Sequence, residues 1–185
     1  VAAQLDPESS PITVRFVEYS ATQEVEGEEL YKEARDALNR RDYEDARMLF
    51  EQLRRRFPES VLVGDSYYYQ AFALYRMASD QNESSARASY DRAVSLIETQ
   101  ASEHPEAATR RDAQSLRARI DGALARGGDA DARRAVGARA QVACNEEANE
   151  TRVMALSALM NMDPARARPL LREVVMDRGA CNGEM

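Results

Sequence analysis

The chain has 185 residues, enough to bury a hydrophobic core, and its richness in alanine, arginine, glutamate and leucine favours helices over strands. The formal net charge is −7 and is concentrated in residues 1–30, which carry seven acidic side chains against Arg15 alone. This distribution argues against a nucleic-acid partner, because neutralising phosphates needs a basic face.

Residues 1–24 are predicted to form an extended acidic N-terminal arm. They contain two prolines, and Ile12, Val14 and Phe16 alternate on one side of a short run. Alternation over so few residues suits a single extended segment, because no second strand follows to complete a sheet. We expect the arm to lie either along its own chain or on a partner surface.

The next segment is predicted to be a helical hairpin. Its first helix runs from about Glu26 to Arg40, and its second runs from a turn at Asp42 and Tyr43 to Pro58. The acidic residues at the start of the first helix suit the positive end of the helix dipole.

One face of this hairpin carries a recognisable pattern. In the second helix, Ala46, Phe50 and Leu53 share a face ahead of Pro58. This spacing resembles the second half of a tetratricopeptide (TPR) repeat, a helix pair of about 34 residues that must stack on a neighbour to bury its apolar side. Leu30 and Ala34 in the first helix, and Tyr43 after the turn, also match the family pattern. Ala37 departs from it.

A second unit follows Pro58. Its first helix includes residues 67–75, with Tyr67, Ala71 and Leu74 facing inward, and its second helix repeats the family spacing with the residues Ala86, Tyr90 and Ala93. The small residues Ala71 and Ala86 are 15 residues apart, three more than the 12 between Ala34 and Ala46 in the first unit. We expect this insertion to lie within residues 80–84.

A third, weaker unit is predicted from Glu106 to about Gln141. Its inner row is Ala113, Leu116 and Ile120, a glycine pair ends its first helix, and Asp129 caps its second helix. It resembles the degenerate third unit of bacterial periplasmic TPR proteins. Residues 25–141 are therefore predicted to be TPR-like.

Residues 142–185 are predicted to form a HEAT-like repeat. The motif Ala-Cys-Asn recurs after 37 residues, and between its copies lie two predicted helices, residues 147–161 and 164–177. Asp163 and Pro164 form a helix start signal, and Pro169 is expected to kink the second helix. The apolar residues at helical spacing are Val153, Ala155, Leu156, Leu159, Met160, Leu170, Leu171 and Val174. The unit resembles HEAT repeats, and we expect the array to continue beyond residue 185.

The two cysteines, Cys144 and Cys181, occupy equivalent positions in this period. In an oxidising compartment they could form a disulfide, which requires two loops to lean together. Alternatively, both are small buried residues at repeat junctions. Two thiols without a nearby histidine do not make a metal site.

No residue pattern predicts catalysis, and we expect no catalytic, cofactor-binding or metal-binding residues. His104 is the sole histidine and precedes a proline, which favours a role at a helix C-terminus. Ser84 and Ser85 are expected to cap a helix. No glycine-rich phosphate loop or nucleophile–histidine–acid set occurs.

The TPR resemblance implies a groove that binds another polypeptide and is lined by the first helix of each pair. The positions that match it are Tyr31, Arg35, Asn39, Tyr68, Phe72, Tyr75, Arg110, Gln114 and Arg117. Aromatic and arginine side chains often dominate interface energies. The alternative is that these are ordinary surface residues beside a core.

Two functions fit this sequence. The first is a non-enzymatic protein–protein interaction scaffold, an exported accessory or stabilising subunit of a larger envelope or membrane-associated complex. The start Val-Ala-Ala-Gln suits a mature chain after signal-peptide removal, which predicts a periplasmic or otherwise extracytoplasmic location. No apolar run of about 18 residues is present, so we expect no transmembrane segment. The alternative is a helical regulatory or substrate-guiding portion of a longer enzyme whose catalytic domain lies beyond residue 185.

Overall fold

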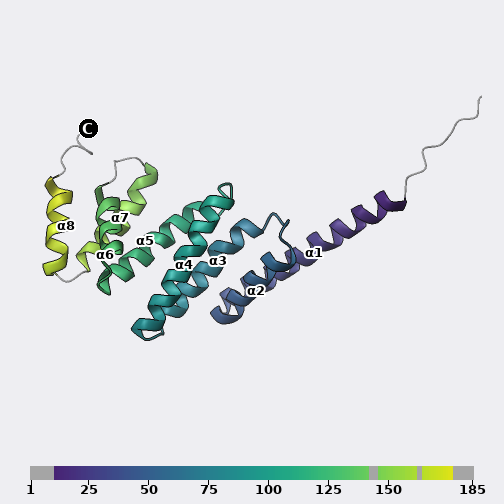
Figure 1. The fold of residues 1–185 in the computed structure, drawn as a ribbon, viewed down its shortest axis with the longest axis horizontal. Coiled ribbons are helices and arrows are strands. Elements are labelled where there is room, and N and C mark those ends of the chain that lie inside the picture. Colours follow the sequence, from purple (N-terminus) through teal and green to yellow (C-terminus); the bar gives the residue numbers. More distant parts are fainter. Residues whose placement is uncertain (1–10, 142–145, 162–163, 177–185) are drawn as a thin grey trace, which may run out of the picture.

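The computed structural model describes residues 11–141, 146–161 and 164–176, and these residues form an all-helical array (Figure 1). The helices are α1 (Pro11–Asn39), α2 (Tyr43–Arg56), α3 (Val63–Ala78), α4 (Glu83–Glu103), α5 (Arg110–Arg126), α6 (Ala130–Gln141), α7 (Glu146–Met160) and α8 (Pro164–Met176). The predicted all-α fold of antiparallel helix pairs is confirmed. The division into a TPR-like part and a HEAT-like part stays a prediction.

The predicted extended arm is wrong from Pro11 onward. Helix α1 begins at Pro11 and continues without a break through residue 24, so that it projects beyond the helix pairs in Figure 1. Proline is well placed at the first position of a helix, and no further proline or glycine follows before Gly27. Ile12 and Phe16 are spaced four apart, which suits a helix as well as a strand. Residues 1–10 lie outside the described residues.

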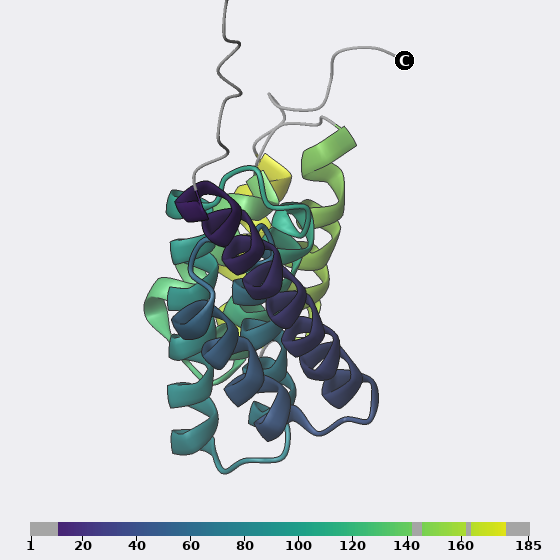
Figure 2. The same cartoon turned by 90° about the vertical axis from the view of Figure 1, so that its right-hand side faces the viewer.

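The helix pairs stack side by side, as Figure 2 shows from the α1 end. Helix α3 contacts both α1 and α5, and α5 contacts α7, whereas α2 and α4, like α4 and α6, are not in contact, and only α6 and α8 meet among the even-numbered helices of the described residues. The odd-numbered helices therefore lie closer together and form the inner side of the array. We call this side the inner face.

The first pair has the core that the TPR pattern predicts. Ala34 and Ala46 are fully buried and allow α1 and α2 to approach closely, and Phe50 fills the space between α1, α2 and α3. The Phe50 ring stacks on Tyr69 at 5.6 Å between centroids. Leu53 and Leu30 extend this core toward the end of α2.

Polar side chains join α2 to α3. Nη1 of Arg54 donates to Oγ of Ser66 at 3.0 Å, and the same guanidinium donates to Gln70 and lies 4.3 Å from the ring centre of Tyr67. Ser66 and Gln70 are buried. Because buried polar groups are costly without partners, this arrangement fixes the register between the first two pairs.

A second polar junction holds α3, α4 and α5 together. Nε2 of the fully buried Gln100 donates to the carbonyl of Gly64 at 2.9 Å and to Oγ1 of Thr109 at 2.8 Å. Oδ1 of Asp65 accepts from the Thr109 backbone N–H at 3.0 Å and from its hydroxyl at 2.9 Å. His104 is the C-cap of α4, as predicted.

The helix caps differ in part from the prediction. Asn82, rather than Ser84 or Ser85, caps α4, because its Oδ1 accepts the backbone N–H of Ser85 at 3.0 Å. Asparagine one turn earlier satisfies the same free N–H groups that a serine would. Asp129 lies just before α6, as predicted, and its Oδ1 accepts from the Ala132 N–H at 2.7 Å. That hydrogen bond and the Arg87 guanidinium lower the pKa of the Asp129 carboxyl.

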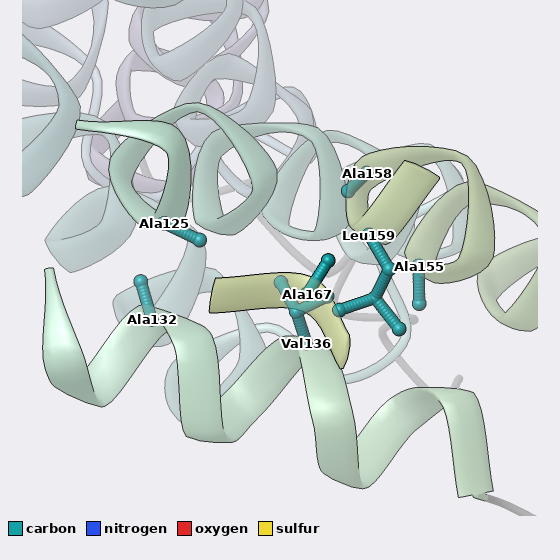
Figure 3. Packing of buried hydrophobic residues seen from close by; sticks show 7 residues of the cluster. All are labelled: Ala125, Ala132, Val136, Ala155, Ala158, Leu159 and Ala167. Carbon is teal, nitrogen blue, oxygen red and sulfur yellow. The ribbon is translucent and has the colours of Figure 1, made fainter. Parts of the chain in front are cut away.

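The fourth pair buries a small-residue core against the third (Figure 3). The buried members of this cluster are Ala125, Ala132, Val136, Ala155, Ala158, Leu159 and Ala167. Leu156, Leu170 and Leu171 are partly buried around it, but Val153 and Met160 are 59% and 78% exposed. Helical spacing alone did not reveal that these two apolar side chains point away from the core. Pro169 lies inside α8, and Cys144, Asp163 and Cys181 lie outside the described residues.

Helices α5 and α7 pack closely at Gly122. A Cβ atom added at this position would lie 2.9 Å from the Cβ of Ala158. We expect Gly122→Ala to lower the free energy of unfolding by about 1–3 kcal/mol because the two helices must separate. Urea unfolding followed by circular dichroism at 222 nm measures this change.

Gly27→Ala is the matched control, since Gly27 also lies in a helix. Its added Cβ would lie 3.5 Å from Cγ of Phe57, which is an ordinary contact. Alanine is the better helix former by about 1 kcal/mol, so we expect this variant to be neutral or stabilised. Equal stability of the two variants would show that the α5–α7 approach tolerates a methyl group.

Candidate functional site

The predicted groove residues of α1 lie beside the aromatic side chains of α3. Tyr31 is half-buried, with its ring centre 5.8 Å from that of Phe50 and 6.0 Å from that of Tyr69. The Arg35 guanidinium lies over the Tyr69 ring at 3.8 Å, and Asn39 is exposed at the end of the helix. Much of the Tyr31 ring surface is thus used in packing α1 on α3.

The predicted residues of α3 form a half-buried aromatic row. The ring centres of Tyr68 and Phe72 are 6.3 Å apart, and Tyr75 lies 6.0 Å from Tyr90 of α4. All three pack partly against the core of the second and third units. Burial raises the pKa of the Tyr68 hydroxyl, so it stays protonated at neutral pH and can donate a hydrogen bond without acting as a nucleophile.

The structure places the predicted residues of α5 elsewhere. Arg117 turns toward α4, where it binds Glu98 at 2.6 Å, and it also binds Asp121 of its own helix at 3.1 Å. Nη1 of Arg110 donates to the Ala101 carbonyl of α4 at 3.0 Å. Gln114 is exposed on the same stripe of α5. The match to the repeat pattern is weakest in this unit, and the predicted register does not select the inner side of α5.

The inner face is hollowed between α3, α5 and α7. The hollow has a volume of about 340 Å³, and all of its lining residues but one belong to α5, α7 or the residue that follows α7. Its lining includes Tyr75, Arg119, Gly122, Arg126, Val153 and Met154. We call this feature the inner hollow.

Of the predicted groove residues, only Tyr75 lines the inner hollow. Arg119, Arg126, Val153 and Met154 were missed. The buried row Ala113, Leu116 and Ile120 could have indicated the true register of α5, since small residues at 118 and 122 flank its inner side. For α7 the sequence held no comparable signal, because its apolar residues surround the helix.

The chemistry of the inner hollow suits binding. Its floor is built from small residues, its walls carry an aromatic ring and exposed aliphatic side chains, and its lining contains two arginines and no carboxylate. Neither Arg119 nor Arg126 forms an ion pair with any residue that the structure describes. Such a surface can take apolar and anionic groups together.

A larger hollow lies between the start of α4 and the end of α5. It has a volume of about 540 Å³ and is lined in part by Tyr90, Leu124 and Arg87. Here the arginine is already neutralised, because Arg87 pairs with Asp129 and Asp91. The two hollows therefore differ in the charge that they offer to a partner.

Two features are absent from residues 11–141, 146–161 and 164–176. These ranges contain no cluster of three or more histidine, cysteine or acidic side chains arranged to hold a metal ion. They also contain no helix that is both long enough and apolar enough to cross a membrane.

A model of a known protein family matches part of the chain. Residues 23–107 match the model of the YfiO family, whose description is outer membrane lipoprotein. The matched region runs from within α1 to just beyond α4, so it includes the first two helix pairs and, of the inner hollow, only Tyr75. The search of curated proteins and the search of solved structures give no match. The resemblance of residues 25–141 to TPR proteins of the bacterial envelope is thus supported over its first two units, and the HEAT-like resemblance stays a prediction.

Proposed function

We propose that this chain is a non-enzymatic protein–protein interaction scaffold that binds another polypeptide on its inner face. In this proposal it is an extracytoplasmic accessory or stabilising subunit of a larger envelope or membrane-associated complex. Partners hold it at the membrane.

The observation that carries the proposal is the inner hollow. It combines a half-buried tyrosine, exposed Val153, Met154 and two arginines that form no ion pair within the described part of the chain, on helices held by the core. Aromatic and arginine side chains supply most of the energy of protein interfaces, and a concave surface presented by packed helices excludes water around them. The half-buried aromatic row of α3 extends the same face toward α1.

The family match supports the proposed location. The matched residues belong to the first two helix pairs, and the family is described as an outer membrane lipoprotein. Helical repeat arrays provide surfaces on which an envelope protein of this kind can contact its partners.

The decisive variant is Val153→Glu. Val153 lines the inner hollow and is 59% exposed, so a glutamate there places a charge in the contact without disturbing the core. We expect co-purification of the native partner from detergent-solubilised membranes to fall about tenfold or more, as for a central interface residue. Quantitative mass spectrometry of the purified complex measures the change.

Met160→Glu is the matched control on the same helix. Met160 is 78% exposed and does not line the hollow. Both variants should keep the unfolding midpoint of the parent chain, because exposed substitutions change stability by about 0.5 kcal/mol or less. If Val153→Glu retains the partner as well as Met160→Glu does, the inner hollow is not the contact surface.

A further inference from the structure

We propose that the inner hollow recognises an acidic segment of its partner, an extended peptide with two carboxylates about 10 Å apart and an apolar side chain near them. This inference rests on the proposed function, because it names the chemistry of the polypeptide that the inner face binds. It concerns α5 and α7, beyond the region that matches a known family.

The inner hollow is positively charged on a chain that is negative overall. The chain as a whole carries −7, yet the inner hollow is lined by Arg119 and Arg126 and by no acidic residue. Other arginines nearby are satisfied, as Arg117 is by Glu98 and Asp121 and as Arg87 is by Asp129. Two exposed arginines that have no ion-pair partner among the described residues attract carboxylates to a concave surface and bind them through paired hydrogen bonds.

The separation of the two arginines matches that of acidic residues three apart in an extended peptide. Arg119 and Arg126 are seven residues apart on one side of α5, which separates them by about 10 Å along the helix axis. In a peptide of polyproline II conformation, residues three apart point in the same direction and lie about 9 Å apart. Two acidic residues with this spacing can therefore reach both guanidinium groups at once.

Apolar side chains line the hollow on both sides of the two arginines. Val153 and Met154 lie on α7 and Tyr75 on α3, so the two arginines of α5 stand between apolar walls. The bottom of the hollow is open to a ligand because Gly122 and Ala158, where α5 and α7 pack together, carry no side chain larger than a methyl group. A volume of about 340 Å³ accommodates an aliphatic or aromatic side chain next to the carboxylates.

A fluorescent peptide tests the inference on the full chain. The probe is acetyl-Pro-Glu-Pro-Leu-Glu-Pro-amide with a terminal dye, and its counterpart has glutamine in place of both glutamates. We expect fluorescence anisotropy to show binding of the probe that is about tenfold or more tighter than binding of the counterpart. Raising the salt concentration should reduce this difference.

Charge reversal on the protein completes the test. The double variant Arg119→Glu plus Arg126→Glu is expected to weaken probe binding about tenfold or more. The control, Arg168→Glu plus Arg172→Glu, makes the same change in net charge at exposed positions of α8 outside the hollow and should leave binding within about twofold. Circular dichroism spectra that match those of the parent chain exclude misfolding.

Two results would overturn the inference. One is equal binding of the probe and its glutamine counterpart. The other is an equal loss of binding in both double variants, which would report net charge alone. If either result occurs while Val153→Glu still loses the native partner, the inner face binds a polypeptide that is not acidic, and the proposed function stands without this inference. If the probe binds as expected while Val153→Glu retains the partner, the proposed function fails and the anion site remains.

Discussion

Phe50→Ala is expected to lower the free energy of unfolding by about 3–5 kcal/mol, because it removes a fully buried ring at the junction of α1, α2 and α3. The ring is held between Tyr31, whose centroid is 5.8 Å away, and Tyr69, at 5.6 Å. Neither tyrosine can collapse into the vacated space without leaving its own contacts, so a cavity remains. Urea unfolding followed at 222 nm would show the loss as an earlier transition.

Met48→Ala is the control for this prediction. Met48 lies in the same helix but is exposed, so its truncation should change the stability by about 0.5 kcal/mol or less. A Phe50→Ala transition that coincides with the Met48→Ala transition would mean that Phe50 does not hold the first two units together.

Asp121→Ala is expected to lower the free energy of unfolding by about 2–3 kcal/mol. The Asp121 side chain is 3% exposed, and it binds Arg117 of its own helix at 3.1 Å and Arg139 of α6. Removing one partner of a buried ion pair costs about 3–5 kcal/mol, and the value is smaller here because water reaches both guanidinium groups. Thermal unfolding should show a lower midpoint temperature for the variant than for the parent chain.

The exposed pair of Asp131 and Arg134 offers a matched control. Both side chains are mostly exposed, so Asp131→Ala should change the stability by less than about 0.5 kcal/mol. If Asp121→Ala costs no more than Asp131→Ala, the two arginines are adequately hydrated and the buried carboxylate does not stabilise the junction.

The helix pairs of the first two units could be predicted because their signals are local. Ala46, Phe50 and Leu53 follow one another at intervals of about one helical turn, and a proline follows them. All three are buried, as the pattern requires. Burial of an apolar stripe is the main force that stabilises a helix pair, so a sequence that carries the stripe also carries the fold.

The start of α1 could not be predicted because its evidence was divided. Ile12, Val14 and Phe16 suit a strand, but the same run lacks a helix breaker after Pro11 and fits a helix equally well. Over so short a window, periodicity does not decide between the two.

The site was only partly predictable, because it depends on how helices far apart in sequence meet. Tyr75 was identified from the repeat pattern, but the inner side of α5 follows from tertiary contacts, including the binding of Arg117 to Glu98 of α4. These contacts rotate the predicted stripe away from the inner face. Val153 is exposed because α7 packs on α5 and α6 through its alanines and leucines.

The absence of contact between α2 and α4, and between α4 and α6, has a mechanical consequence. When the first three pairs bend against one another, α2, α4 and α6 have no helix packing between them to break, so resistance comes mainly from α1, α3 and α5 and from the joints between successive pairs, whereas α6 and α8 do pack together. The first three pairs should therefore bend more easily along the even-numbered side than along the odd-numbered side. An array that bends in this way can stay in contact with a partner that changes shape.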